Sequence, residues 1–178
     1  YARKGGPFEM IQLWVNLPAK DKMSPPRYQG ITASQIPCAA LPVDAGEVHI
    51  IAGTYQSASG LMTGPASTFT PMNVWDVRLK SGAGATFTLP EGHTCAVFVA
   101  SGALAFGDQT VGAAEMAVME RAGDTLQLQA TQDCKLLLMS GQPLDEPVVG
   151  YGPFVMNTEQ EIHQAFADFR AGKMGAIA

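Results

Sequence analysis

The stretch ATFTLPEGHTCAVFVASGALAFG, residues 85–107, decides the fold, because three short apolar runs follow one another within it. A Pro-Glu-Gly sequence beginning at Pro90 separates the first two runs, and Ser101 with Gly102 separates the last two. Short apolar runs joined by such turn residues are typical of antiparallel β-strands. The three runs are residues 85–89, 95–100 and 103–107.

The same pattern continues on both sides of this stretch and predicts an all-β fold. Turn residues separate strands that lie about ten residues apart, a spacing typical of an antiparallel sandwich or barrel. No helical period lies between the runs, which excludes an alternating β–α arrangement. The further strand candidates are residues 48–52, 74–80, 116–120, 125–130 and 135–139.

The segment that precedes this region reads as one more strand and a linker. Residues 11–17 (IQLWVNL) alternate apolar and polar side chains, which predicts a half-buried strand that ends at Pro18. Residues 19–28 (AKDKMSPPRY) are mostly polar and contain two prolines, so we expect an extended loop there.

A short amphipathic helix is predicted near the C-terminus. Thr158 and Glu161 have the spacing of a capping box at a helix start. Gly172 stands where a glycine that ends a helix is expected. We expect an apolar stripe to dock this helix on the rest of the chain; its members are Ile162, Ala165, Phe166 and Phe169.

The composition excludes several classes of protein. The formal net charge is −5 and no run of Lys or Arg occurs, which argues against direct contact with nucleic acid or with an anionic membrane. No apolar run is long enough to cross a bilayer, and the first residues lack the apolar segment of a signal peptide. Only 15% of the residues are charged, against about 25% in a typical domain, so we expect something else to cover part of this surface.

The cysteines indicate a reducing compartment. Cys38, Cys95 and Cys134 are odd in number, widely spaced and free of any C-x-x-C pattern. This favours reduced, mostly buried thiols over a disulfide framework or a zinc finger. We therefore expect a cytoplasmic location.

The three histidines do not define a catalytic or metal site by their spacing. His49, His93 and His163 form no H-x-H or H-E-x-x-H pattern, so we interpret each as solvated or singly hydrogen-bonded. Glu47 lies on the same strand face as His49. His93 and Cys95 point to one side of an extended segment, but Cys95 opens an apolar strand, which favours a core role over a thiolate dyad. No serine-nucleophile or phosphate-binding motif occurs.

Two long stretches resemble the pirin family. Residues 5–29 (GGPFEMIQLWVNLPAKDKMSPPRYQ) resemble the segment that joins the two cupin domains of that family. Residues 141–175 (GQPLDEPVVGYGPFVMNTEQEIHQAFADFRAGKMG) resemble its C-terminal segment, from the last strand into the terminal helix. The order and spacing of the two stretches also fit, so the resemblance covers essentially the whole chain.

The resemblance implies a bicupin, that is, two jelly-roll-like β-barrels packed face to face. It implies that residues 1–30 are the last strand of the N-terminal cupin and a linker, 31–157 the C-terminal cupin, and 158–178 a helix and tail. In the family the N-terminal cupin holds a metal, usually iron, through three histidines and a glutamate. Those ligand motifs precede the segment that begins this chain, so no family metal ligand and no catalytic residue carries over onto these 178 residues.

The resemblance also allows a direct comparison of the two barrels. We align the hairpin around Ser101 and Gly102 with the corresponding hairpin of the family's N-terminal cupin. In this alignment, the positions of the metal-binding histidines and glutamate hold Thr, Pro and Gln in this chain. Thr and Pro are not competent ligands for a divalent transition metal, and Gln is a weak one. We therefore expect no metal in this chain, and iron or another divalent metal in the N-terminal cupin. The aligned positions are Thr88 and Pro90 for two histidines, and Gln127 and Gln129 for the His-x-Glu pair.

The activity implied for the intact bicupin is metal-dependent dioxygenation of a flavonol such as quercetin. This chain would then supply a metal-free barrel that acts as scaffold and lid, with the N-terminal cupin as its partner and a flavonoid as substrate. The alternative is a non-enzymatic regulator, a transcriptional cofactor or a module that docks on a metabolic enzyme. The residues expected at the contact between the two cupins are Trp14, Tyr28, Phe154 and Met156.

Overall fold

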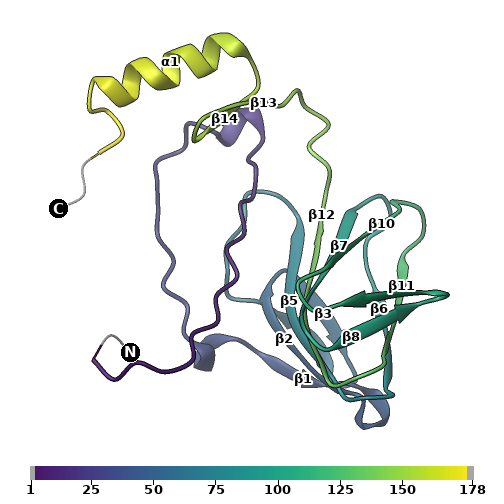
Figure 1. Ribbon diagram of the computed structural model, residues 1–178. Coiled ribbons are helices and arrows are strands. Elements are labelled where there is room, and N and C mark those ends of the chain that lie inside the picture. Colours follow the sequence, from purple (N-terminus) through teal and green to yellow (C-terminus); the bar gives the residue numbers. More distant parts are fainter. Residues whose placement is uncertain (1–2, 176–178) are drawn as a thin grey trace. The chain divides into compact units, whose positions relative to one another are not determined.

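The computed structural model describes residues 3–175 (Figure 1). The chain forms two compact units, which we treat separately. The sandwich unit is Ser24–Asp145, and the terminal unit combines the chain before residue 24 with the chain after residue 145. The expected assignment of residues 1–30 to a preceding domain stays a prediction.

The sandwich unit contains two antiparallel sheets and a small hairpin. Six strands make the larger sheet, in the order β1 (Cys38–Ala40), β2 (Gly46–Ala52), β5 (Met72–Leu79), β12 (Cys134–Gly141), β7 (Thr94–Ser101) and β10 (Met116–Met119). Four strands make the smaller sheet, in the order β6 (Gly84–Thr88), β11 (Thr125–Ala130), β8 (Ala103–Phe106) and β9 (Gln109–Gly112). The hairpin pairs β3 (Thr54–Ser57) with β4 (Gly60–Thr63), and two 3-10 turns, Ala33–Gln35 and Pro42–Asp44, flank β1.

The core lies between the two sheets, and several strands bury every second side chain toward it. In β5 the buried positions are every second residue from Asn73 to Leu79, and in β6 they are Ala85 and Phe87. Trp75 from the larger sheet and Phe87 from the smaller one are among the largest fully buried side chains, with their ring centroids 5.9 Å apart. The expected all-β, antiparallel fold is confirmed, and the sheets form a jelly-roll-like sandwich rather than a closed barrel.

All eight strands predicted within the sandwich unit are present, with ends that differ by a few residues. The strands that the sequence did not predict, β1, β3, β4 and β9, have three or four residues each. Runs this short complete few alternations, although β8 and β10, with four residues each, were predicted.

The predicted strand over residues 11–17 is wrong. These residues pair with no other described segment, and Ile11, Leu13 and Val15 are exposed rather than half-buried. A strand requires a partner for its backbone hydrogen bonds, and apolar alternation alone does not supply one. The following stretch, expected to be extended, begins with the short 3-10 turn Ala19–Asp21.

The terminal unit contains the hairpin β13 (Val149–Tyr151) with β14 (Phe154–Met156) and the helix α1 (Glu159–Arg170). The predicted capping box is confirmed, because the Glu161 amide donates to Thr158 Oγ1 at 3.2 Å and the Thr158 amide donates to Glu161 Oε2 at 2.9 Å. Gly172 adopts a φ of +73° just after the helix, as a terminating glycine does.

The apolar stripe of α1 is confirmed except at its end. Ile162 and Ala165 are buried, and Phe166 packs edge-on against Phe154 with ring centroids 5.0 Å apart. Phe169 also lies edge-on to Phe154, with ring centroids 6.4 Å apart, but 63% of its surface remains exposed, so it contributes only in part. No helix in residues 3–175 has the length and apolar character needed to span a membrane.

Candidate functional site

The interior of the sandwich does not offer the donors of a metal centre. On β6 and β11 the side chains that face the core are apolar, among them Phe87, Leu126 and Leu128. The only buried polar side chains among the described residues are Ser57, Asn73 and Ser140, and Asn73 Nδ2 donates to Ser140 Oγ at 3.1 Å. Without an imidazole or carboxylate inside, this interior does not fit the His₃Glu centre of the family's other cupin.

The residues aligned with the family's ligands lie outside the core. Side chains alternate between the two faces of a strand, so a one-residue difference in alignment reverses the face. The inward position beside Gln127 and Gln129 is Leu128, which is a hydrocarbon side chain. The aligned positions therefore do not face the interior, and the expectation of a metal-free sandwich stays a prediction. The four exposed residues are Thr88, Pro90, Gln127 and Gln129.

His93 and Cys95 line one cavity of about 220 Å³ at the edge of the sandwich. Burial lowers the pKa of His93, and its Nδ1 is buried with no hydrogen-bond partner. Burial also raises the pKa of Cys95 to about 11. Cys95 is therefore a neutral thiol near pH 7 and part of the core, as the sequence predicted, and a thiolate dyad finds no support.

The outer face of the six-stranded sheet carries a compact polar group, which we call the Cys38 cluster. It comes from three neighbouring strands, and the register places Cys38 opposite His49, His49 opposite Asp76, and Glu47 opposite Arg78. The intervening side chains of β2 point into the core and anchor the strand, so the cluster rests on a rigid support. Its members are Cys38, Glu47, His49, Asp76 and Arg78.

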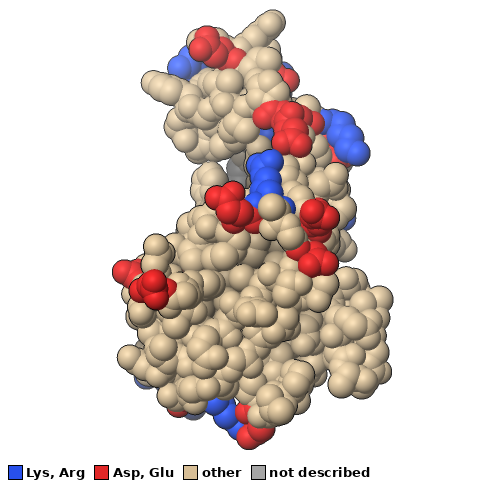
Figure 2. Space-filling model, turned by 90° about the vertical axis from the view of Figure 1, so that its right-hand side faces the viewer, with Lys and Arg blue, Asp and Glu red and all other residues tan. Residues whose placement is uncertain are grey.

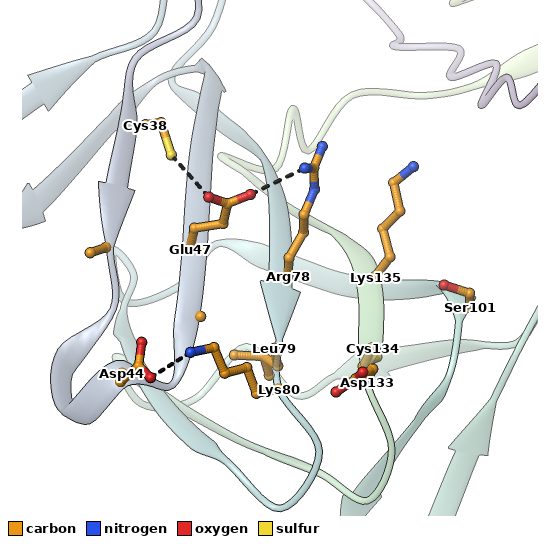
Figure 3. Close-up of a pocket in the computed structure, with 12 residues that line it drawn as sticks. Cys38, Asp44, Glu47, Arg78, Leu79, Lys80, Ser101, Asp133, Cys134 and Lys135 are labelled. Carbon is orange, nitrogen blue, oxygen red and sulfur yellow. Dashed lines mark hydrogen bonds and ion pairs between the residues drawn. The ribbon is translucent and has the colours of Figure 1, made fainter.

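Figure 3 shows Glu47 between Cys38 and Arg78, and the Glu47 carboxylate also contacts His49. Its Oε1 lies 3.0 Å from His49 Nε2 and 3.1 Å from Arg78 Nη1. The Cys38 Sγ lies 3.8 Å from Glu47 Oε2 and 3.7 Å from His49 Nε2. Arg78 also binds Asp76, with Nη2 and Oδ2 3.2 Å apart, while Asp76 Oδ1 is buried and has no hydrogen-bond partner.

Neighbouring charges and burial shift the pKa values of Glu47 and Cys38. The hydrogen bond with His49 lowers the pKa of Glu47, with help from Arg78. Burial and the Glu47 carboxylate raise the pKa of the Cys38 thiol. With no cation bound, the cluster therefore contains an ionised Glu47 and a protonated Cys38 near pH 7.

A groove of about 700 Å³ opens beside the cluster (Figure 3). Cys38, Glu47 and Arg78 line one part of it, and Lys80, Lys135 and Asp133 line another. The side chains of Cys38 and Glu47 point toward each other, and Arg78 extends alongside Lys135. Small polar solutes can therefore reach the donor atoms of Cys38 and Glu47.

At its other edge the same sheet face is apolar. Met116 and Val118 on β10 are 56% and 65% exposed, and their register partners on β7 are Phe98 and Ala96. In the view of Figure 2 charged side chains are scattered, and most of the visible surface carries none. Exposed apolar surface on an edge strand is typical of an interaction surface.

The four residues expected at an inter-domain contact differ in their surroundings. Trp14 is 70% exposed and Tyr28 is 94% exposed. Trp14 and Met156 line the same cavity of about 310 Å³ within the terminal unit. Phe154 is half-buried against Phe166, so part of its surface serves the terminal unit itself. Their role toward another domain stays a prediction.

The sequence did not reveal the Cys38 cluster. The thiols were expected to be free and mostly buried; Cys95 and Cys134 are buried, while Cys38 lies on the outer face of the short strand β1. The expectation that donor atoms of this chain do not converge is wrong here, since Cys38, Glu47 and His49 each offer one within 4.8 Å of the others. The alternation that placed Glu47 and His49 on one face was the available clue; the pairing with β1 was not visible.

The three thiols should differ in reactivity. All are free, but Cys95 and Cys134 are buried and burial raises the pKa of both. We expect a maleimide to label Cys38 alone in the folded chain, and faster as the pH rises, because the thiolate is the nucleophile. Mass spectrometry of peptides after brief labelling measures this. Equal labelling of the three sites in the folded chain would contradict the structure.

The antiparallel sheets and the apolar interior define a cupin-type sandwich. Residues 74–175 match the family model described as the pirin C-terminal cupin domain. The chain belongs to the pirin family.

Relatives agree with this assignment. A protein of Pseudomonas aeruginosa named "Putative quercetin 2,3-dioxygenase" is 52% identical over 169 residues, which is 95% of this chain and 58% of that protein. Rat "Pirin" is 38% identical, over 95% of this chain and 58% of its own length. The structure of quercetin 2,3-dioxygenase from Acinetobacter baumannii matches with a TM-score of 0.85 and 45% identity, covering 93% of this chain and 56% of that one. The chain thus spans less than two thirds of the length of these relatives.

Proposed function

We propose that this chain is the C-terminal cupin of a two-cupin, pirin-type protein that oxygenates a flavonol such as quercetin. The metal, expected to be iron, would be bound in the other cupin and would supply the redox chemistry with O₂. The bacterial relatives named putative quercetin 2,3-dioxygenase support the reaction class. The observation that supports this assignment is that no imidazole or carboxylate is buried among the described core residues, where Leu126 and Leu128 take the inward positions.

The proposed role of this barrel is that of a scaffold and lid for the metal-bearing cupin. The exposed apolar edge at Met116 and Val118 supports such a role, because it can be covered by a second domain. The exposed side chains of Trp14 and Tyr28 offer further apolar contact area. A dry, closed pocket around a metal strengthens the control that a protein exerts over its reactivity. The free cysteines fit the proposed cytoplasmic location.

The test uses the longer protein that contains these residues. Its metal content and its O₂ uptake with quercetin should both be positive, and removal of the metal should abolish the uptake. Replacing Gln127 and Gln129 together by Ala should leave the redox-metal content and the uptake unchanged, because both side chains face away from the core. Loss of that metal in this double variant would contradict the donor-free interior.

The alternative is a regulator without turnover, which the resemblance to the pirin family also implies. Bound metal with no O₂ uptake on any flavonol tested would favour it over the enzyme. Absence of both redox metal and O₂ uptake would contradict the enzyme proposal itself.

A further inference from the structure

We infer that Cys38, Glu47 and His49 form a surface binding site for a divalent zinc ion. This site is separate from the metal of the proposed oxygenase, since it lies on the outer face of the sheet and not inside a cupin. It concerns metal binding rather than turnover. The inference therefore does not rest on the proposed function and can fail independently of it.

The types of donor suit zinc. The three side chains offer one thiolate sulfur, one imidazole nitrogen and one carboxylate oxygen, the ligand types that Zn²⁺ takes in proteins. Calcium and magnesium prefer oxygen ligands, so a sulfur and a nitrogen disfavour them. The mixed set with a thiolate selects a borderline-soft transition metal.

The spacing of the donor atoms also suits zinc. Bond lengths of about 2.3 Å to sulfur and about 2.0 Å to nitrogen or oxygen place tetrahedral ligand atoms about 3.3–3.5 Å apart. In the cluster, Cys38 Sγ lies 3.7 Å from His49 Nε2 and 3.8 Å from a Glu47 oxygen, and His49 Nε2 lies 3.0 Å from the other Glu47 oxygen. One ligand atom from each of the three side chains lies within 4.8 Å of the other two, so the donors converge closely enough for one ion to draw them together.

The backbone already holds the three donors in place. Cys38 and His49 are direct cross-strand partners, and Glu47 shares a face with His49 on the same strand. The neighbouring Val48 and Ile50 are fully buried, so β2 cannot rotate to separate the donors without exposing core. A site placed on paired strands loses little entropy when the ion binds, which favours affinity.

The charges of the carboxylates in the Cys38 cluster favour the binding of a cation. Glu47 and Asp76 carry two negative charges against the single positive charge of Arg78. Ionisation of Cys38 upon binding adds a third negative charge, and a divalent ion then leaves the group neutral. The Oδ1 atom of Asp76, beside His49, is buried and has no hydrogen-bond partner. It can therefore accept a hydrogen bond from a water molecule bound to the ion or from a protonated neighbouring side chain.

Three protein ligands leave a fourth position open. The adjacent groove of about 700 Å³ reaches Cys38 and Glu47, so water or a small anionic ligand can occupy that position. An open position distinguishes this site from a purely structural zinc site, which is closed by four protein ligands. Metal binding also displaces the Cys38 proton, so the bound ion should protect that thiol from alkylation.

The experiment titrates Zn²⁺ into the reduced 178-residue chain in competition with a chelator of known affinity. We expect one equivalent to bind with a Kd in the micromolar range or below, and cobalt substituted for zinc to show a thiolate charge-transfer band. Cys38→Ser and His49→Gln should each weaken binding about tenfold or more, and Cys38→Ser should remove the band. His163→Gln on the exposed face of α1 is the matched control and should change neither.

Circular dichroism and thermal melting of each variant show whether it remains folded, which is expected because Cys38 is exposed and His49 lies on the outer face. The proposed site would be wrong if the chain did not bind Zn²⁺. It would also be wrong if the folded Cys38→Ser and His49→Gln variants bound Zn²⁺ as tightly as the unchanged chain. Neither outcome bears on O₂ uptake by the longer protein, so the two proposals fail separately.

Discussion

Replacing Trp75 by Ala should lower the free energy of unfolding of the sandwich unit by about 3–5 kcal/mol. Trp75 is 1% exposed and lies on the larger sheet, and its indole contacts Phe87 of the smaller sheet. The ring of Tyr55 lies edge-on to it, with centroids 5.3 Å apart. Truncation would leave a cavity between the sheets and remove both aromatic contacts at once.

Urea denaturation followed by circular dichroism measures this loss. Trp14→Ala is the matched control, because Trp14 is 70% exposed and belongs to the terminal unit, so its removal should cost no more than about 0.5 kcal/mol. Trp75→Phe should lose less than Trp75→Ala, since a ring remains and the unpaired, buried Nε1 donor disappears. A similar, small loss for both alanine variants would show that Trp75 does not join the two sheets.

Gly102→Ala should destabilise the sandwich unit by about 3 kcal/mol or more, through two additive effects. Gly102 connects β7 of the larger sheet with β8 of the smaller one, and its φ of +82° is unfavourable for any other residue. A Cβ at this position would lie 2.2 Å from the carbonyl oxygen of Asp133 and 2.8 Å from the Cα of Cys134. Both atoms belong to the backbone, so neither can move aside without disturbing the start of β12.

Gly92→Ala separates the two effects. Gly92 has nearly the same φ, +80°, but a Cβ there would meet no atom within 4 Å. Its alanine variant should therefore lose only the conformational part, about 1–2 kcal/mol. Thermal or urea unfolding of the two variants in parallel measures the difference. Equal losses would contradict the close approach of Gly102 to Asp133.

The sequence predicts the strands well wherever one strand has five or more residues with one buried face. Residues 125–130 became β11 with unchanged ends, because Leu126, Leu128 and Ala130 alternate with polar residues. The capping box at Thr158 was equally visible, since it depends on residues only three apart. Both patterns are local, and local patterns can be read without knowing the partner strands.

Residues 11–17 show where this reading fails. Their alternation satisfies one requirement of a strand, yet no described segment pairs with them. Pairing depends on residues far away in the sequence, which alternation does not identify. The resemblance of two sequence stretches to the pirin family indicated the family correctly, because residues 74–175 match the model of the pirin C-terminal cupin domain.

By itself, the sequence of this chain determined an antiparallel β fold and a terminal helix with its cap, because alternation and helical spacing are local properties. Only the tertiary structure decided that Cys38 lies beside Glu47 and His49, nine and eleven residues further along the chain. The register between β1 and β2 brings these donors together, and register follows from the packing of buried side chains and from the turn that joins the strands.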